Sequence, residues 1–213
     1  MKDILEKIRD AENIYVPKGE DREPCVAAFQ ELSGIEVPTF QEEDLKARSQ
    51  GRTFWLFKGM DIPRLLGCYE GIGIAGTDSV AENRIRNQGT PVVARKIGEP
   101  MCRFSVLAEK DRVGRAKSVI NADPRYARTA LTIPTSRPRL LAEICSWRDL
   151  GFVPLEEPQV SGSIESMASL TGIGIVADLV RTGKTAYDNR LQEVYSLCDV
   201  YPEIVLRAED ASL

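Results

Sequence analysis

The stretch Ile173-Gly174-Ile175-Val176-Ala177-Asp178-Leu179-Val180-Arg181-Thr182-Gly183-Lys184-Thr185 joins an apolar run, an acid, a short Thr/Gly turn and a helix-like segment. We expect a buried strand over Ile173–Val176 and a helix that begins near Thr185. A strand that leads through a tight turn to a helix N-terminus directs backbone N–H groups and the helix dipole at one point. The pattern predicts an anion site, and an ordinary strand–turn–helix connection is the alternative interpretation.

The residue types in this turn indicate which anion would bind. Two threonine hydroxyls add donors, and Gly183 lets the backbone approach a ligand closely. Asp178 can accept hydrogen bonds from a sugar diol, as acids do in dinucleotide folds. The stretch therefore predicts a site for a ribose 5′-phosphate, formed by Asp178, Arg181, Thr182, Gly183, Lys184 and Thr185.

The segment Gly183-Lys184-Thr185 also resembles the end of a Walker A loop. That loop requires a second glycine five residues before Gly183. Asp178 occupies that position, which argues against a nucleoside-triphosphatase P-loop.

Composition limits the class of protein. The chain has 213 residues, enough for one large domain or two small lobes. A net charge of −4 and an aromatic content of 7% argue against a nucleic-acid partner. No apolar run approaches the roughly 18 residues of a membrane span, and the N-terminus lacks a secretory signal pattern. We therefore expect a cytoplasmic protein without a nucleic-acid or membrane partner.

The chain has five scattered cysteines and no histidine. No cysteine pair has metal-ligand spacing, so reduced thiols are expected. The absence of histidine excludes Ser-His and Cys-His nucleophilic catalysis and the common zinc sites.

Candidate strands and helices alternate along the chain, which predicts an α/β fold with mostly parallel sheets. We expect helices over 1–12, 22–32, 62–69, 77–82, 136–150 and 163–170, and further strands over 13–16, 53–57, 71–75, 103–107, 130–133, 153–155, 193–197 and 203–207. Residues 84–100 are interpreted as a crossing loop or hinge. Gly71-Ile72-Gly73-Ile74 recurs as Gly172-Ile173-Gly174-Ile175, which fits two similar lobes or a chance recurrence.

Six segments, in order, resemble the ATP phosphoribosyltransferase family. They are Val16-Pro17-Lys18-Gly19, Asp61-Ile62-Pro63, Gly71-Ile72-Gly73-Ile74-Ala75-Gly76-Thr77-Asp78, Cys102-Arg103-Phe104, Gly162-Ser163-Ile164-Glu165, and the loop from Asp178 through Thr185 to Asn189. The resemblance implies the short form of an enzyme that transfers phosphoribosyl from phosphoribosyl pyrophosphate to N1 of ATP, in the first step of histidine biosynthesis. It further implies Mg²⁺, a homo-oligomer and a regulatory subunit resembling a histidyl-tRNA synthetase.

The same resemblance implies a fold like the type II periplasmic binding proteins, with two α/β lobes around a central cleft. Lobe I would be discontinuous, with residues 1–99 and 191–213. Lobe II, with residues 100–190, would carry the phosphoribosyl-binding loop. A small-molecule or phosphometabolite binding protein on the same fold, or an enzyme with another acceptor, is the alternative function.

Further site residues follow from the resemblance. It implies catalytic roles for Lys18, Lys58 and Arg103, and nucleotide contacts for Asp78 and Glu165, and it names no metal ligand. The plain alternatives are solvated lysines, a structural ion pair for Arg103, and helix-capping acids.

The sequence departs from the family in several places. Glu20 stands where the family usually has arginine, and an acid there would repel phosphates. Lys184 and Ala186 replace the usual small residue and leucine around the last threonine of the loop. The first 12 residues are additional, and a docking role on a partner subunit is one interpretation of them.

Overall fold

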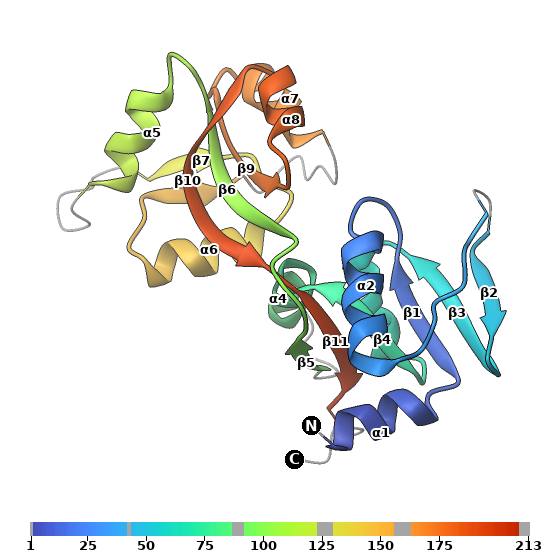
Figure 1. The fold of residues 1–213 in the computed structure, drawn as a ribbon. Helices are drawn as coiled ribbons and strands as arrows, with labels where there is room; N and C mark the ends of the chain where they lie inside the picture. The colour runs from blue at the N-terminus through green and yellow to red at the C-terminus, as the bar shows by residue number, and fades with distance from the viewer. Residues whose placement is uncertain (1, 42–43, 87–91, 123–129, 156–162, 209–213) are drawn as a thin grey trace. The chain divides into compact units, whose positions relative to one another are not determined.

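The computed structural model describes residues 2–41, 44–86, 92–122, 130–155 and 163–208. The chain forms two compact units, Met1–Met101 with Val200–Leu213, and Cys102–Asp199 (Figure 1). The first unit is therefore discontinuous in sequence. The sequence expectation assigned residues 191–199 to lobe I. In the structure they belong to the second unit, because the strand β10 (Leu191–Val200) is part of its sheet.

A six-stranded sheet forms the centre of the first unit. Its order is β2 (Lys46–Ser49), β3 (Arg52–Phe57), β1 (Asn13–Pro17), β4 (Ile72–Gly76), β11 (Pro202–Arg207) and β5 (Val92–Lys96). Strand β1 runs parallel to β3 and β4, whereas β2, β11 and β5 pair antiparallel with their neighbours. The expectation of mostly parallel sheets is wrong, because the returning strand β11 enters between β4 and β5.

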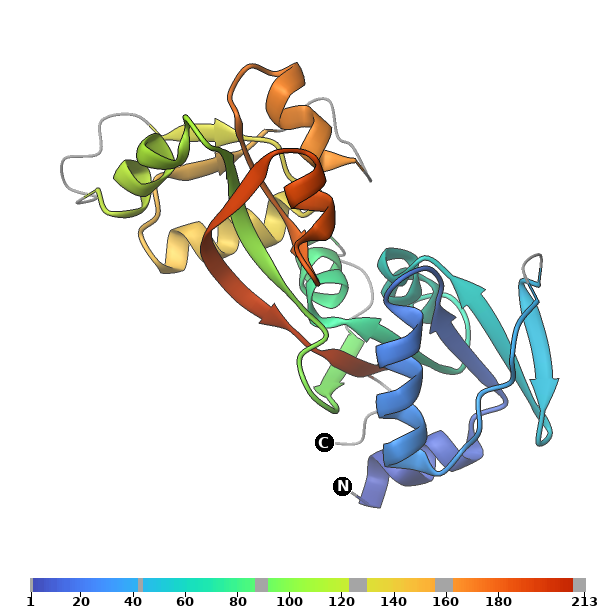
Figure 2. The ribbon, with the colours of Figure 1, turned by 45° about the horizontal axis from the view of Figure 1, so that its top comes forward.

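Alternating side chains divide the core of this unit between the two faces of the sheet. Ile14 and Val16 of β1 pack with Phe29 of α2 (Arg22–Ser33), which lies along one face (Figure 2). Tyr15, between them in sequence, packs with Ile62 of α3 (Ile62–Leu66) in a second cluster. A short 3₁₀ helix (Gly59–Asp61) precedes α3, and α4 (Thr77–Arg86) follows β4.

The N-terminal helix α1 (Lys2–Asp10) belongs to the same core. Ile8 is 1% exposed, and Ile4 and Leu5 pack against the cluster that contains Phe29. The apolar face of α1 therefore packs against the core of its own unit, which argues against docking of this face on a partner subunit.

The second unit has a three-stranded sheet in the order β10, β6 (Cys102–Glu109) and β9 (Ile175–Val180), in which β6 and β9 are antiparallel. Strands β7 (Leu131–Ile133) and β8 (Phe152–Pro154) form a parallel pair. The helices are α5 (Val113–Ile120), α6 (Pro138–Trp147), α7 (Ile164–Leu170) and α8 (Lys184–Asp188). A bridge between Thr135 and Ala177 joins the β7–α6 connection to β9.

The α/β class is confirmed, and most expected elements are present. Strand β9 is shifted from the expected Ile173–Val176 to Ile175–Val180, so that Asp178 lies inside the strand. The repeated tetrapeptide is not a structural repeat. Ile72 and Ile74 lie in β4, whereas Gly172 and Gly174 precede β9 with left-handed φ values of 66° and 68°. Within the described ranges, no helix is long and apolar enough to cross a membrane.

Candidate functional site

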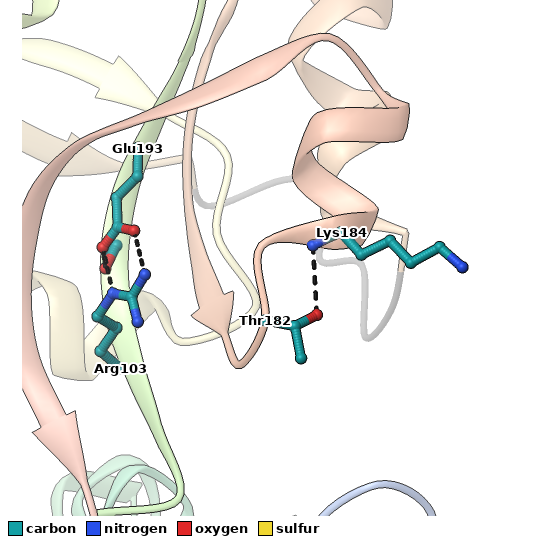
Figure 3. A network of polar contacts seen from close by, with 5 residues as sticks. Arg103, Thr182, Lys184 and Glu193 are labelled. Carbon is teal, nitrogen blue, oxygen red and sulfur yellow. Dashed lines mark hydrogen bonds and ion pairs between the residues drawn. The ribbon is translucent and has the colours of Figure 1, made fainter.

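The turn after β9 forms an exposed elbow, which we define as Arg181–Thr185. Gly183, with φ 76°, takes the left-handed conformation at the N-cap position of α8. The backbone N–H of Lys184 donates to Thr182 Oγ1 at 3.3 Å, and the Lys184 side chain extends away from the strand (Figure 3). The elbow therefore combines hydroxyl groups, backbone N–H groups and an amine on an exposed turn.

The helix that follows the elbow contributes less than the sequence suggested. α8 has only five residues, so its dipole is small. The side chain of Asn189 donates to the carbonyl of Thr185 at 2.9 Å and closes the C-terminal end of this helix. Hydroxyls and backbone groups, rather than the helix dipole, are the features of the elbow that can bind an anion.

Asp178 lies on β9 three residues before the elbow. Its Oδ1 accepts a hydrogen bond from Ser136 Oγ at 2.7 Å. Burial raises the pKa of the Asp178 carboxyl above its usual value, the Ser136 hydroxyl and the Leu179 N–H oppose that rise, and the nearby Glu165 carboxylate adds to it. Glu165 lies in the first turn of α7, so two predicted binding acids are neighbours in this unit.

Arg103 lies on β6 in an ion pair that the sequence did not specify. Its Nε and Nη2 both contact the Glu193 carboxylate of β10 at 2.5 Å (Figure 3). Ser105 Oγ donates to the same carboxylate at 2.8 Å. This pairing holds the pKa of Glu193 below its usual range. The geometry matches the structural ion pair that was the alternative for Arg103.

Three predicted residues gather in the first unit, at the carboxyl ends of its parallel strands. Lys18 directly follows β1, Lys58 follows β3, and Asp78 lies in the first turn of α4 after β4. The backbone N–H of Lys18 donates to Phe57 O at 2.8 Å, which places both lysine positions at one sheet edge. Both lysines are exposed, whereas Asp78 is 1% exposed.

The carboxyl edge of parallel strands is where open α/β sheets bind ligands. A glycine adjoins Asp78 there. A Cβ added at Gly76 would lie 2.3 Å from Asp78 Oδ1, so the carboxylate packs directly on this backbone position. The buried position of Asp78 fits a structural role in the turn better than a direct ligand contact.

Apart from Arg103, which is paired with Glu193 in the second unit, the predicted site residues lie in two groups. Lys18, Lys58 and Asp78 share one edge of the first unit, and the elbow, Asp178 and Glu165 share one region of the second unit. The predicted central cleft and the predicted roles of these residues stay predictions. Within the described part of the chain, no cluster of three or more acids or cysteines could hold a metal ion.

Sequence reasoning missed two polar partners in the second unit. The sequence places Ser136 only at the start of the expected helix over 136–150, whereas in the structure its hydroxyl is bonded to Asp178 across 42 residues of sequence. Glu193 pairs with Arg103 across 90 residues. The expected helix over 136–150 is present as α6, but no local pattern indicates which distant carboxylate Ser136 contacts.

Comparison with known proteins places this chain in a family. The family model for ATP phosphoribosyltransferase matches residues 58–212. An ATP phosphoribosyltransferase of Pyrococcus furiosus is 28% identical over 186 residues, which span 87% of this chain and 82% of that protein. One from Deinococcus radiodurans is 27% identical over 199 residues, spanning 89% and 78% respectively.

A solved structure supports the same fold. A chain of the ATP phosphoribosyl transferase (HisG:HisZ) complex from Thermotoga maritima superimposes with a TM-score of 0.61 at 19% identity, covering 91% of this chain and 86% of that chain. The present chain belongs to the ATP phosphoribosyltransferase family, the enzymes of the first step of histidine biosynthesis.

Proposed function

We propose that this chain binds phosphoribosyl pyrophosphate at the elbow and transfers its phosphoribosyl group to N1 of ATP, with release of pyrophosphate. The observation that carries this assignment is the exposed elbow at the end of β9, with the Asp178 carboxylate beside it. Family membership supplies the reaction, and the elbow supplies a surface that fits a ribose 5′-phosphate.

The elbow would hold the 5′-phosphate. The Thr182 hydroxyl accepts the Lys184 N–H and keeps its own hydrogen to donate, and Thr185 offers a second exposed hydroxyl. The Lys184 amine adds a positive charge, and Arg181 is exposed on the same turn. Asp178 would accept hydrogen bonds from the ribose hydroxyls, because ionised carboxylates are strong acceptors. Glu165, in the first turn of α7, would contact the nucleotide.

The reaction requires no histidine base. N1 of adenine is neutral and carries a lone pair, so it attacks C1′ without prior loss of a proton. The protein instead has to align the two substrates, which can supply a large part of the rate enhancement. The absence of histidine from the chain is compatible with this chemistry.

The pyrophosphate leaving group has to be neutralised as the bond breaks. We assign this role to the exposed amines of Lys18 and Lys58, which share one edge of the first unit. Mg²⁺ would enter with the phosphates of the substrates, since this ion keeps several waters and needs few protein ligands. We assign Arg103 no contact with the leaving group, because Glu193 engages two of its guanidinium nitrogens.

Family membership also motivates the proposed context. We propose a cytoplasmic homo-oligomer that works with a histidyl-tRNA-synthetase-like regulatory subunit. The HisG:HisZ composition of the Thermotoga maritima complex supports this proposal.

The test is formation of phosphoribosyl-ATP from ATP, phosphoribosyl pyrophosphate and Mg²⁺, followed spectrophotometrically with and without the regulatory subunit. We expect turnover that depends on both substrates. Thr182→Ala and Thr185→Val should each raise the KM for phosphoribosyl pyrophosphate roughly tenfold, since each removes a hydrogen bond to a charged group. Thr132→Val, an exposed threonine of β7, is the matched control. An unchanged KM in both elbow variants would contradict the site.

A further inference from the structure

We propose that Ser136 is a positioning residue for the phosphoribosyl site, because its hydroxyl holds one oxygen of the Asp178 carboxylate and directs the other toward the ribose. This inference rests on the proposed function. It concerns a residue of the β7–α6 connection, about 42 positions from its partner in sequence, which the elbow motif does not contain.

The first argument is that Ser136 is held in place by its neighbours. Thr135 forms a bridge with Ala177, and the Ala177 N–H donates to Pro134 O at 2.9 Å. The Arg137 N–H donates to Thr135 Oγ1 at 3.0 Å. These contacts tie the connection to β9 immediately before Asp178, so the serine is fixed on both sides.

The second argument is the geometry of the contact itself. Ser136 Oγ lies 2.7 Å from Asp178 Oδ1, a normal distance for a hydroxyl that donates to a carboxylate. A carboxylate oxygen that accepts this bond cannot rotate freely. The second oxygen is then oriented, which reduces the ordering cost when a sugar diol binds.

The third argument is electrostatic. Three elements and the strand itself place groups near Asp178: Glu165 of α7, Arg137 beside Ser136, Ser105 as its cross-strand neighbour on β6, and the following Leu179 N–H. Burial and Glu165 oppose ionisation of the carboxyl. Among the groups that favour the ionised carboxylate, the Ser136 hydroxyl has the largest effect and Arg137 has a smaller one.

Loss of the hydroxyl should therefore impair ionisation of Asp178 as well as its orientation. In Ser136→Ala, the pKa of the carboxyl should move further upward. Binding of the ribose requires the ionised acceptor, so the acidic limb of the pH profile should move in the same direction.

The experiment compares pH profiles of kcat/KM for phosphoribosyl pyrophosphate in the complete enzyme with its regulatory subunit. Ser136→Ala should move the acidic limb upward by about one pH unit and raise KM roughly tenfold at neutral pH, with kcat changed less. Ser136→Thr keeps the hydroxyl and should restore the wild-type limb. Ser118→Ala, which loses a serine hydrogen bond of 3.0 Å to Gly114 O in α5, is the matched control and should leave the profile unchanged.

A wild-type acidic limb in folded Ser136→Ala would overturn the inference. If that variant does not fold, Ser136→Cys keeps the volume with a weaker donor, and the same shift is required of it. Failure of this inference can be told apart from failure of the proposed function. The proposed function fails if the wild-type enzyme does not use phosphoribosyl pyrophosphate, or if Asp178→Asn binds this substrate as tightly as the wild type.

Discussion

Replacing Asp178 by asparagine should weaken substrate binding without destabilising the protein. The substitution keeps the size of the side chain and an oxygen that can still accept from Ser136, whose hydroxyl lies 2.7 Å from Oδ1. It removes the negative charge that we assign to the ribose hydroxyls. We expect Asp178→Asn to bind phosphoribosyl pyrophosphate more weakly while the protein stays fully folded.

The magnitude for binding follows from the type of hydrogen bond. Bonds to a charged acceptor contribute about 1.5–3 kcal/mol each, more than bonds to a neutral amide. A loss of about 2–3 kcal/mol corresponds to a roughly 30- to 160-fold rise in the Kd for phosphoribosyl pyrophosphate.

The same substitution should leave the thermal stability of the folded protein unchanged or raise it. Burial raises the pKa of Asp178 in the folded state, so folding favours the protonated carboxyl. The ionised form therefore costs stability at neutral pH, and this cost is absent below the titration range of an unfolded aspartate. Asp178→Asn should hold or raise Tm at neutral pH, and the difference from wild type should disappear as the pH falls through that range.

Calorimetric titration with phosphoribosyl pyrophosphate and Mg²⁺ gives the Kd, and thermal unfolding gives Tm over a range of pH. Asp188→Asn is the matched control, because Asp188 is exposed on α8 and has no assigned role. An unchanged Kd for Asp178→Asn would refute the ribose assignment. A large drop in Tm at neutral pH would refute the electrostatic reasoning.

Three further predictions concern other parts of the chain. Glu20→Arg should raise kcat/KM with ATP, because it replaces a repelling carboxylate beside Lys18 with a cation; a drop or no change would count against this reasoning. Gly76→Ala should cost about 1–3 kcal/mol in urea unfolding, since the new Cβ would lie 2.3 Å from Asp78 Oδ1. Gly114→Ala, with nothing within 4 Å of the new Cβ, is its control and should not destabilise. Glu193→Gln should cost about 1 kcal/mol at neutral pH. The pKa of Glu193 is lowered in the folded wild-type protein, so the ion pair stabilises the fold above the pKa of an unfolded glutamate, and this stabilisation should be lost in acid. A stability difference between wild type and variant that does not change with pH would contradict the ion-pair explanation.

The sequence predicts the elements of this fold better than their pairing. The apolar runs within 13–16 and 71–75 indicate buried strands, and the helix expected over 136–150 is present as α6. The position of β11 between β4 and β5 depends on contacts between residues far apart in sequence. Local periodicity does not report such pairings, so the sheet was wrongly expected to be mostly parallel.

Strand β9 shows how a boundary error changes a site. The apolar run was expected to end at Val176, but the strand continues through Asp178 to Val180. Pairing with β6, in which Ser105 lies opposite Asp178 and Arg103 lies opposite Val180, extends β9 past the acid. The elbow itself was predicted from Thr182 and Gly183, because turn chemistry is local, whereas the Ser136 contact required the folded chain.

A crystal structure of the protein with phosphoribosyl pyrophosphate and Mg²⁺ tests the central assignment most directly. We predict the 5′-phosphate within hydrogen-bond distance of the Thr182 and Thr185 hydroxyls, and a ribose hydroxyl donating to Asp178. Density for the substrate at any other surface, with the elbow empty, would contradict the assignment.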